Sequence, residues 1–380
     1  MKRILFITIL LFCLLFCATL SLAQDWETKR QDAINKAIIY LRTKQSDNGA
    51  FSPEKGIGPS ALILCGLLDV GVQPNDPMTA KGLQFLENST QEDGGIYTKG
   101  GFFQNYETCM TVQCFATANR IIGKMSSPES FPYSERLVNA QKYLLNEQFT
   151  ETKGINPENS FYGGAGYGRH QRPDLSNTQF FLDALKAIGK NSNDPAIQKA
   201  LIFISRCQNL ESEHNTLPFA SKNPDGGFIY TAATQQSMAG ETPEGGLRSY
   251  ASMTYAGLKS MIYAGLTKED KRVKAAHEWL RKHYNIHENP GLGADGLFYY
   301  YKTMSKTLHV MQLDKFEDAT GKKHNWRSDL VTMLCAKQRS DGSWINDTSK
   351  RWMEDDANLV TGFVLMVLAD CKNEKMKSLE

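Results

Sequence analysis

The sequence predicts an all-α protein in which six outer and six inner helices alternate as an (α/α)6 toroid, forming one domain over about residues 25–371. Three observations carry this prediction. Amphipathic helical patterns recur along the chain, a glycine-rich turn with an aromatic residue follows each of them, and a second, more apolar helical pattern follows each turn. Because six such pairs close a ring, we expect residues 24–380 to hold a single toroid.

Residues 1–23 have the features of a secretory signal peptide. Lys2 and Arg3 precede an apolar run from Ile4 to Phe16, and Ser21-Leu22-Ala23 supplies small residues at −3 and −1. The apolar run is shorter than the about 20 residues that a membrane span needs. We therefore expect cleavage after Ala23 and an exported protein, periplasmic or secreted, with an uncleaved anchor as the alternative. No later segment has the apolar length of a transmembrane helix.

The charge balance excludes one class of partner. The chain has 43 Lys plus Arg against 41 Asp plus Glu, and the surplus of two lies in the signal segment. The remaining chain is neutral, which argues against nucleic-acid binding. Six cysteines follow residue 23, all inside helical patterns, so we interpret them as small buried hydrophobes, although an exported protein could pair them. No CxxC or HExxH spacing occurs, and we expect neither a metal nor a cofactor.

The elements follow in a fixed order within each repeat. Five of the outer patterns run to a glutamine: Gln45, Gln91, Gln148, Gln208 and Gln338. Glycine then supplies the positive φ that stops a helix and reverses the chain. Inner helices are predicted over 58–70, 106–121, 174–188, 248–265, 298–312 and 356–370. Asp-Pro pairs such as Asp76-Pro77 begin the next outer helix, since Asp caps a helix and Pro fits its first turn.

The run from Gln338 through Gly342 to Trp344 matches the QxxxGxW repeat of squalene–hopene cyclases, and Gln45 and Gln91 begin similar runs with another aromatic. The chain therefore resembles the terpenoid cyclase and protein prenyltransferase family over nearly its whole length after residue 23. The resemblance implies a toroid whose lumen takes an isoprenoid. We interpret the glutamine as a structural residue whose amide bonds free backbone groups at an inner-helix start. Noncatalytic toroids of the complement thioester and cobalamin-carrier types share this architecture, so fold alone does not fix function.

Squalene–hopene cyclases protonate an alkene with a DxDD aspartate, and the nearest match here is Met353-Glu354-Asp355-Asp356. The resemblance assigns Asp355 to the proton-donor position and Asp356 to the last one, while Met353 replaces the first aspartate. Two such acids at the start of a helix also serve as caps, which is the structural alternative. Protein prenyltransferases hold zinc through Asp, Cys and His; Glu107-Thr108-Cys109 is only superficially similar, and no nearby His completes a set.

Long segments between outer and inner helices, at 149–173, 209–247 and 285–297, all open on the face where inner helices begin. We expect this face to bind the ligand, with the lumen as the pocket. Candidate ligand-binding residues are His170, Asp174, Asn177, Tyr250, Tyr255, Lys302, Lys306 and His309. Lys302, Lys306 and His309 lie on one face of a helix that should be buried. They therefore suit an anionic ligand, or else pair with acids or reach water.

Two function classes remain open. One is a terpene cyclase or prenyltransferase-like enzyme acting on an isoprenoid, which needs a dry aromatic lumen with a proton donor or a diphosphate site. The other is a noncatalytic or polysaccharide-directed toroid that binds an extracytoplasmic ligand, a glycan or a protein. An apolar, closed lumen favours the isoprenoid enzyme, and an open, polar lumen favours the glycan- or protein-binding toroid.

Overall fold

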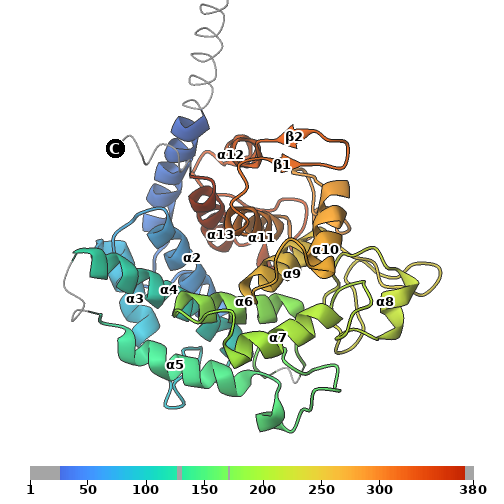
Figure 1. Ribbon diagram of the computed structural model, residues 1–380. Coiled ribbons are helices and arrows are strands. Elements are labelled where there is room, and N and C mark those ends of the chain that lie inside the picture. Colours follow the sequence, from blue (N-terminus) through green and yellow to red (C-terminus); the bar gives the residue numbers. More distant parts are fainter. Residues whose placement is uncertain (1–25, 126–130, 170–171, 373–380) are drawn as a thin grey trace, which may run out of the picture.

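The computed structural model describes residues 26–125, 131–169 and 172–372, which form two concentric rings of helices (Figure 1). In this part of the chain the outer ring holds helix 26–42, α3 (Pro77–Glu87), α5 (Ser134–Glu147), α7 (Pro195–Arg206), α10 (Lys271–Lys282) and α12 (Trp326–Lys337). The inner ring holds α2 (Gly58–Asp69), α4 (Gln104–Met125), α6 (Leu175–Ala187), α9 (Ala251–Tyr263), α11 (Leu297–Val310) and α13 (Ala357–Asp370). The predicted (α/α)6 toroid is therefore confirmed.

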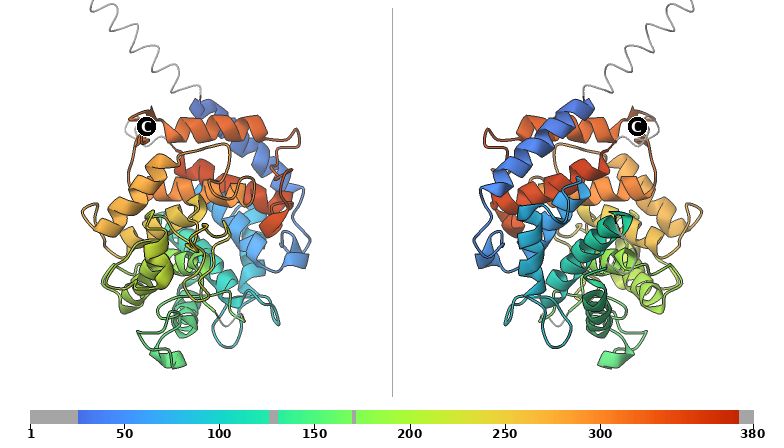
Figure 2. Two further views of the ribbon diagram at one scale, coloured as in Figure 1. Left: turned by 90° about the vertical axis from the view of Figure 1, so that its right-hand side faces the viewer. Right: turned by 90° about the vertical axis from the view of Figure 1, so that its left-hand side faces the viewer.

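Both rings close on themselves. The inner helices contact one another in the order α2, α4, α6, α9, α11, α13, and α13 packs back against α2. In the outer ring, helix 26–42 lies beside α12 (Figure 2), where Gln338 Nε2 donates to the Ala33 carbonyl at 2.9 Å. The inner helices are apolar and buried on most of their faces, so the outer helices cover them and leave one wet face each.

Several short elements lie in the segments that connect these helices. Helix α8 (Pro218–Lys222) lies between α7 and α9, and a hairpin of β1 (Phe316–Glu317) and β2 (Lys323–His324), with Phe316 opposite His324, lies between α11 and α12. Single 3-10 turns are η1 (Pro53–Lys55), η3 (Glu151–Lys153) and η4 (Arg351–Met353). The signal-like segment lies outside the described residues. Within those residues, the six cysteines are free thiols and no helix has both the length and the hydropathy of a membrane span.

In five repeats the turn after the outer helix approaches the next outer helix very closely. Five turns use a glycine with φ between 82° and 94°, namely Gly49, Gly94, Gly163, Gly226 and Gly342. A Cβ on any of them would lie 1.8–2.9 Å from a backbone carbonyl oxygen of the next outer helix. Both the backbone conformation and the lack of space therefore require glycine at these positions.

Glutamines fix the same junction. Gln45, Gln148, Gln208 and Gln338 each donate through Nε2 to the carbonyl of their own turn glycine at 2.9–3.0 Å and to a carbonyl of the next outer helix at 2.8–2.9 Å. Gln91 donates only within its own turn, to Ser89 and Tyr97. Our expectation that these amides bond the inner-helix starts was wrong, because the neighbouring outer helix is the element within reach.

A hydroxyl in the first two turns of the inner helix makes the corresponding link inward. The residue two places after each turn glycine donates its N–H at 2.8–3.2 Å to Ser60, Thr108, Thr178, Thr254 or Thr361. That donor residue is buried and is aromatic in three repeats, but it is Ile96 and Ala165 in the other two. The aromatic residues Tyr97 and Tyr167 of those two repeats therefore lie outside the junction.

Two buried glutamates cap inner helices from neighbouring segments. Glu107 accepts from the N–H group of Ile57 at 3.0 Å, at the start of α2, and from the N–H group of Thr98 at 2.8 Å, in the segment before α4. Glu354 accepts from the N–H groups of Phe298 at 2.9 Å and Tyr299 at 2.8 Å, at the start of α11. Burial raises the pKa of Glu354 to about 7, since these hydrogen bonds only partly offset the lost hydration.

Replacing Gly163 by alanine tests the close approach. A left-handed backbone costs roughly 1–2 kcal/mol for a residue with a Cβ, and overpacking adds about 1–3 kcal/mol. Gly154 in the same loop is the matched control, because it has φ +70° but open space around its Cβ, whereas the Cβ at Gly163 would meet the Lys199 oxygen at 1.8 Å. Urea denaturation should show a clearly larger loss for Gly163→Ala than for Gly154→Ala, and equal losses would contradict the steric role.

The capping glutamate predicts a pH dependence of stability. The pKa of Glu354 is about 7 in the folded protein against an ordinary 4.5, so the folded chain binds this proton more tightly than the unfolded chain does. The contribution of this group to the free energy of unfolding should therefore fall as pH rises through this window, by about 3 kcal/mol. Glu354→Gln keeps an oxygen for the helix N–H groups and should make the fall with pH clearly smaller. Urea denaturation between about pH 5 and about pH 8 measures it, and an unchanged slope would refute the assignment.

Candidate functional site

A cavity of about 360 Å³ lies inside the inner ring, at the end where the inner helices begin. We call it the aromatic chamber because nine aromatic side chains line it: Phe103, Tyr106, Tyr167, Phe180, Tyr230, Tyr250, Tyr299, Trp352 and Phe363. Methionine, leucine and proline side chains add further apolar wall. Trp352 and Phe103 remain 40% and 38% exposed, so the chamber reaches solvent at these two side chains.

Two of the three long segments that we predicted to open on the face of the inner-helix starts contribute to this chamber. The segment 149–173 supplies Tyr167, and 209–247 supplies Tyr230. The third segment, 285–297, supports α11 from outside, since its Asn285 carbonyl accepts from the Tyr300 hydroxyl at 2.6 Å. The chamber is therefore built jointly by inner-helix starts and by two of the three insertions.

The chamber rings are held in place by one another and by polar contacts. Phe180 of α6 packs edge-on against Tyr106 at 5.2 Å between centroids, and its ring lies 6.3 Å from that of Tyr299. The Tyr299 hydroxyl accepts from Gln179 Nε2 at 2.6 Å and lies 2.9 Å from the Ser176 hydroxyl. These contacts fix the wall formed by α4, α6 and α11 before any ligand binds.

Trp352 and Met353 line the mouth in a strained backbone conformation, with φ of 55° and 63°. Such positions cost roughly 1–3 kcal/mol each and cluster at ligand sites. The Trp352 ring lies over Gly296, where an added Cβ would approach it to 2.9 Å, and the Arg351 guanidinium lies 4.7 Å from the ring centroid. Surrounding contacts therefore hold the indole at the edge of the chamber.

The two acids selected by the resemblance lie at the start of α13. Asp356 is buried and caps the helix by accepting from the N–H groups of Asn358 at 2.8 Å and Leu359 at 3.2 Å. It also pairs with Lys55 at 3.1 Å. Asp355 is exposed and does not line the chamber, so it lacks the burial that an acid acting on an alkene requires. Their catalytic role stays a prediction, while the geometry of Asp356 is that of a cap.

A different acid lies next to the chamber wall. Asp174 is buried at the start of α6 and accepts from Asn177 through its backbone N–H and its side chain, both at 2.8 Å. Its carboxyl group also interacts electrostatically with Tyr230 and with Tyr167, which places the acid beside two rings of the chamber. Burial raises the pKa of Asp174 to about 6, although the hydrogen bonds oppose the shift. The structure thus brings two predicted residues, Asp174 and Asn177, to the chamber edge.

The remaining predicted residues divide between the chamber and the core. Tyr250 lines the chamber, whereas Tyr255 is buried below it and packs against Tyr300 at 5.9 Å. Lys306 and His309 do not line the chamber; Lys306 lies 3.6 Å from Asp370. His170 lies outside the described residues.

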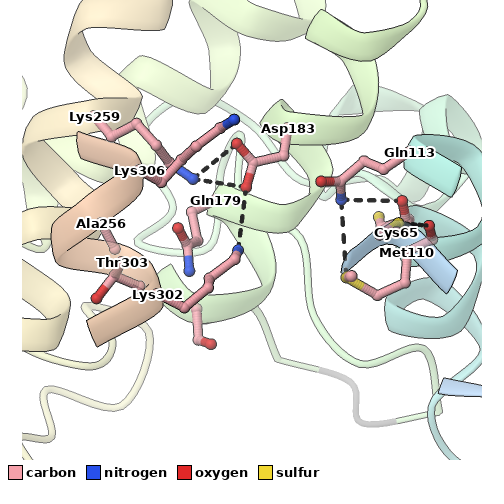
Figure 3. Close-up of polar contacts among 12 residues, drawn as sticks. Cys65, Met110, Gln113, Gln179, Asp183, Ala256, Lys259, Lys302, Thr303 and Lys306 are labelled. Carbon is pink, nitrogen blue, oxygen red and sulfur yellow. Dashed lines mark hydrogen bonds and ion pairs between the residues drawn. The ribbon is translucent and has the colours of Figure 1, made fainter. Parts of the chain in front are cut away.

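Below the chamber the lumen is filled by buried charges. Lys259 of α9 donates to both oxygens of Asp183 at 2.6 and 2.7 Å, and Lys302 of α11 lies 3.8 Å from the same carboxylate (Figure 3). Burial alone would raise the pKa of Asp183, but attraction by Lys259 and Lys302 outweighs it and lowers that pKa below its usual range. Of the lysines that suggested an anionic ligand, Lys306 therefore pairs with Asp370, whereas Lys302 only approaches a carboxylate that Lys259 already occupies.

Sequence reasoning missed most of the chamber wall. Tyr106 and Phe180 lie in the first two turns of their inner helices, and an aromatic residue at that position in several repeats was an available signal. Tyr230 and Trp352 come from irregular segments, where no periodicity indicates which way a side chain points. No sequence pattern marked Asp183 as a buried ion-pair residue, because its partners Lys259 and Lys302 lie on other helices. In the described residues, no group of three His, Cys, Asp or Glu side chains is arranged to hold a metal.

Comparison with solved structures identifies the architecture. A variant of the type II terpene cyclase MstE from Scytonema aligns at a TM-score of 0.53 and 11% identity, over 91% of this chain and 98% of that one. Unaltered MstE aligns at 0.51 and 11%, over 93% and 99%. No protein-family model and no curated protein matches the sequence. At this identity the likeness concerns the fold, and the chain has the all-α toroid of the terpenoid cyclases.

Proposed function

We propose that this protein binds an isoprenoid-class ligand in the aromatic chamber and acts as a terpene-cyclase-like protein. The observation that carries the proposal is the chamber itself, a cavity of about 360 Å³ bounded by nine aromatic side chains at the end of the toroid where the inner helices begin. Small-molecule sites are concave, mostly apolar cavities with a few placed polar groups, and typical volumes begin near 300 Å³. The chamber fits that description.

The chemistry of the wall favours an unsaturated hydrocarbon over a sugar. Apolar and aromatic surface gains about 25 cal/mol for each Å² that a ligand covers. The hydroxyls of Tyr230 and Tyr299 are already engaged by Asp174, Gln179 and Ser176, which leaves their ring faces for the ligand. A glycan needs many free donors and acceptors, so the polysaccharide-directed alternative is less well supported, and a protein partner would not use an internal cavity. The structural likeness to a type II terpene cyclase supports the same ligand class.

Farnesol titration tests this ligand class directly. Added farnesol should raise the midpoint of thermal unfolding, because a ligand that binds only the folded state stabilises it by RT ln(1 + [L]/Kd). Ser176 lines the chamber, so Ser176→Trp should fill it and weaken binding by at least about tenfold, which is about 1.4 kcal/mol. Ser221→Trp is the matched control, since Ser221 is exposed on α8 and does not line the chamber. Equal binding by both variants, or no isoprenoid retained by the purified protein on mass spectrometry, would overturn the proposal.

A second candidate function is acid-initiated isomerisation of the bound isoprenoid. The specific observation is Asp174, a buried acid with a pKa of about 6 that interacts electrostatically with the chamber residue Tyr230. A carboxyl group held partly protonated near neutral pH can pass a proton to a ligand, and surrounding rings stabilise the resulting cation. Asp174 supports this role better than Asp355, which is exposed.

Paired substitutions separate the two acids. Asp174→Asn keeps the helix cap, since Asn caps as well as Asp, but it removes the acid. Any turnover of a polyprenyl substrate should fall by about 100-fold or more in this variant, while farnesol binding persists. Asp355→Asn should leave turnover unchanged. Loss of turnover in Asp355→Asn alone would show that Asp355, not Asp174, is the catalytic acid. If the wild-type protein does not convert such substrates, the isomerisation proposal is wrong and only ligand binding remains.

Export of this protein is part of the proposal and rests on the sequence of residues 1–23. N-terminal sequencing of the mature protein checks it, with Gln24 expected as the first residue.

A further inference from the structure

Lys302 lies directly behind the wall of the aromatic chamber. Tyr299, three residues earlier on α11, lines the chamber, so Lys302 is almost one helical turn deeper on the same face. Its side chain is only 3% exposed, and its ammonium lies 4.4 Å from the centroid of the Phe180 ring. Phe180 also lines the chamber, so the amine and the chamber both contact this ring.

The amine of Lys302 is incompletely paired. Lys259 takes both oxygens of Asp183 at 2.6 and 2.7 Å, whereas Lys302 stays 3.8 Å from that carboxylate (Figure 3). Within the part of the chain that the structure describes, its ammonium makes no hydrogen bond. A buried ammonium in this position is poorly compensated, because burial is costly unless the charge is paired and hydrogen-bonded.

The surrounding charges favour the neutral form of this amine. Lys259 on α9 and Lys306 on α11 repel its proton, while Asp183 on α6 and Asp370 on α13 attract it. Burial and the nearby lysines outweigh the aspartates and lower the pKa of Lys302 to about 8. The uncharged amine, which is the nucleophilic form of lysine, is therefore much more populated at neutral pH than for an exposed lysine.

We propose that Lys302 forms an imine with the aldehyde group of an apolar ligand held in the aromatic chamber. The amine nitrogen attacks the carbonyl carbon, the carbon–oxygen bond breaks, and the two amine hydrogens leave with the oxygen as water. A proton taken up from solvent then gives the protonated imine. Asp183 stands 3.8 Å from the nitrogen as its counter-ion, in the place it holds for the ammonium.

An aldehyde suits this position better than an anion. A carboxylate or diphosphate would lie beside the buried Asp183, and that repulsion would oppose the attraction of Lys302. A carbonyl group is neutral and becomes positive only on condensation, where the carboxylate stabilises it. The isoprenoid chain would remain among the chamber rings, and the reacting end would pass Phe180. This inference rests on the proposed function, because it takes the ligand to be an isoprenoid.

Farnesal and farnesol share one carbon skeleton and differ in the reactive end, so together they test the two proposals separately. The protein is incubated with farnesal, reduced with borohydride and analysed by intact-mass and peptide mass spectrometry. One adduct per chain is expected, on the peptide that contains Lys302. Lys302→Arg keeps the positive charge but cannot form a stable imine, so labelling should fall by at least about tenfold while farnesol still raises the unfolding midpoint. Lys142→Arg, at an exposed lysine on α5, should label like the wild type.

The Phe180 ring, which the amine and the chamber both contact, gives an independent variant. Phe180→Leu should speed labelling at Lys302, because a smaller side chain opens the path to the amine. Farnesol binding without a farnesal adduct would overturn the imine and leave the proposed function standing. Adducts spread over exposed lysines would overturn it equally, and the absence of both farnesol binding and labelling would overturn the two proposals together.

Discussion

The close approach of each turn glycine to the next outer helix is the constraint on which the rest of this structure depends. A backbone carbonyl of the neighbouring helix occupies the space that a Cβ would need at Gly49, Gly94, Gly163, Gly226 and Gly342. A glutamine amide then bridges the same two segments in four repeats, and a serine or threonine hydroxyl ties the turn to the inner helix. Outer helix, turn and inner helix are thereby fixed in one geometry that repeats around the ring.

This geometry places every inner-helix start on one face and so divides the lumen into two chemically different halves. The half near the helix starts is aromatic and open enough to hold a ligand, while the half near the helix ends holds a group of aspartates and lysines. A buried ion pair contributes little net stability, because the desolvation penalty of both charges offsets their attraction.

The fold could be predicted from the sequence because the same pattern of helical periodicity, glutamine and glycine recurs in several repeats. One atypical repeat therefore does not change the predicted architecture. The site residues have no such repeated pattern. Asp355 and Asp356 differ by one position, and only the exact start of α13 decides that Asp356 turns inward as a cap while Asp355 stays in water. Tyr230 and Trp352 come from segments without periodicity, and Asp183 meets Lys259 only through packing of α6 against α9.

Closure of the outer ring through Gln338 and Ala33 has a kinetic consequence. Open solenoids can nucleate anywhere and lengthen one unit at a time, because each unit touches only its neighbours in sequence. Here the last junction joins segments 305 residues apart, and it uses the same glutamine contacts as three other junctions. The entropy of bringing such distant segments together must be overcome before those contacts form. The ring should therefore fold and unfold as a single cooperative unit, because neither terminal repeat can unfold without breaking the junction that closes the ring.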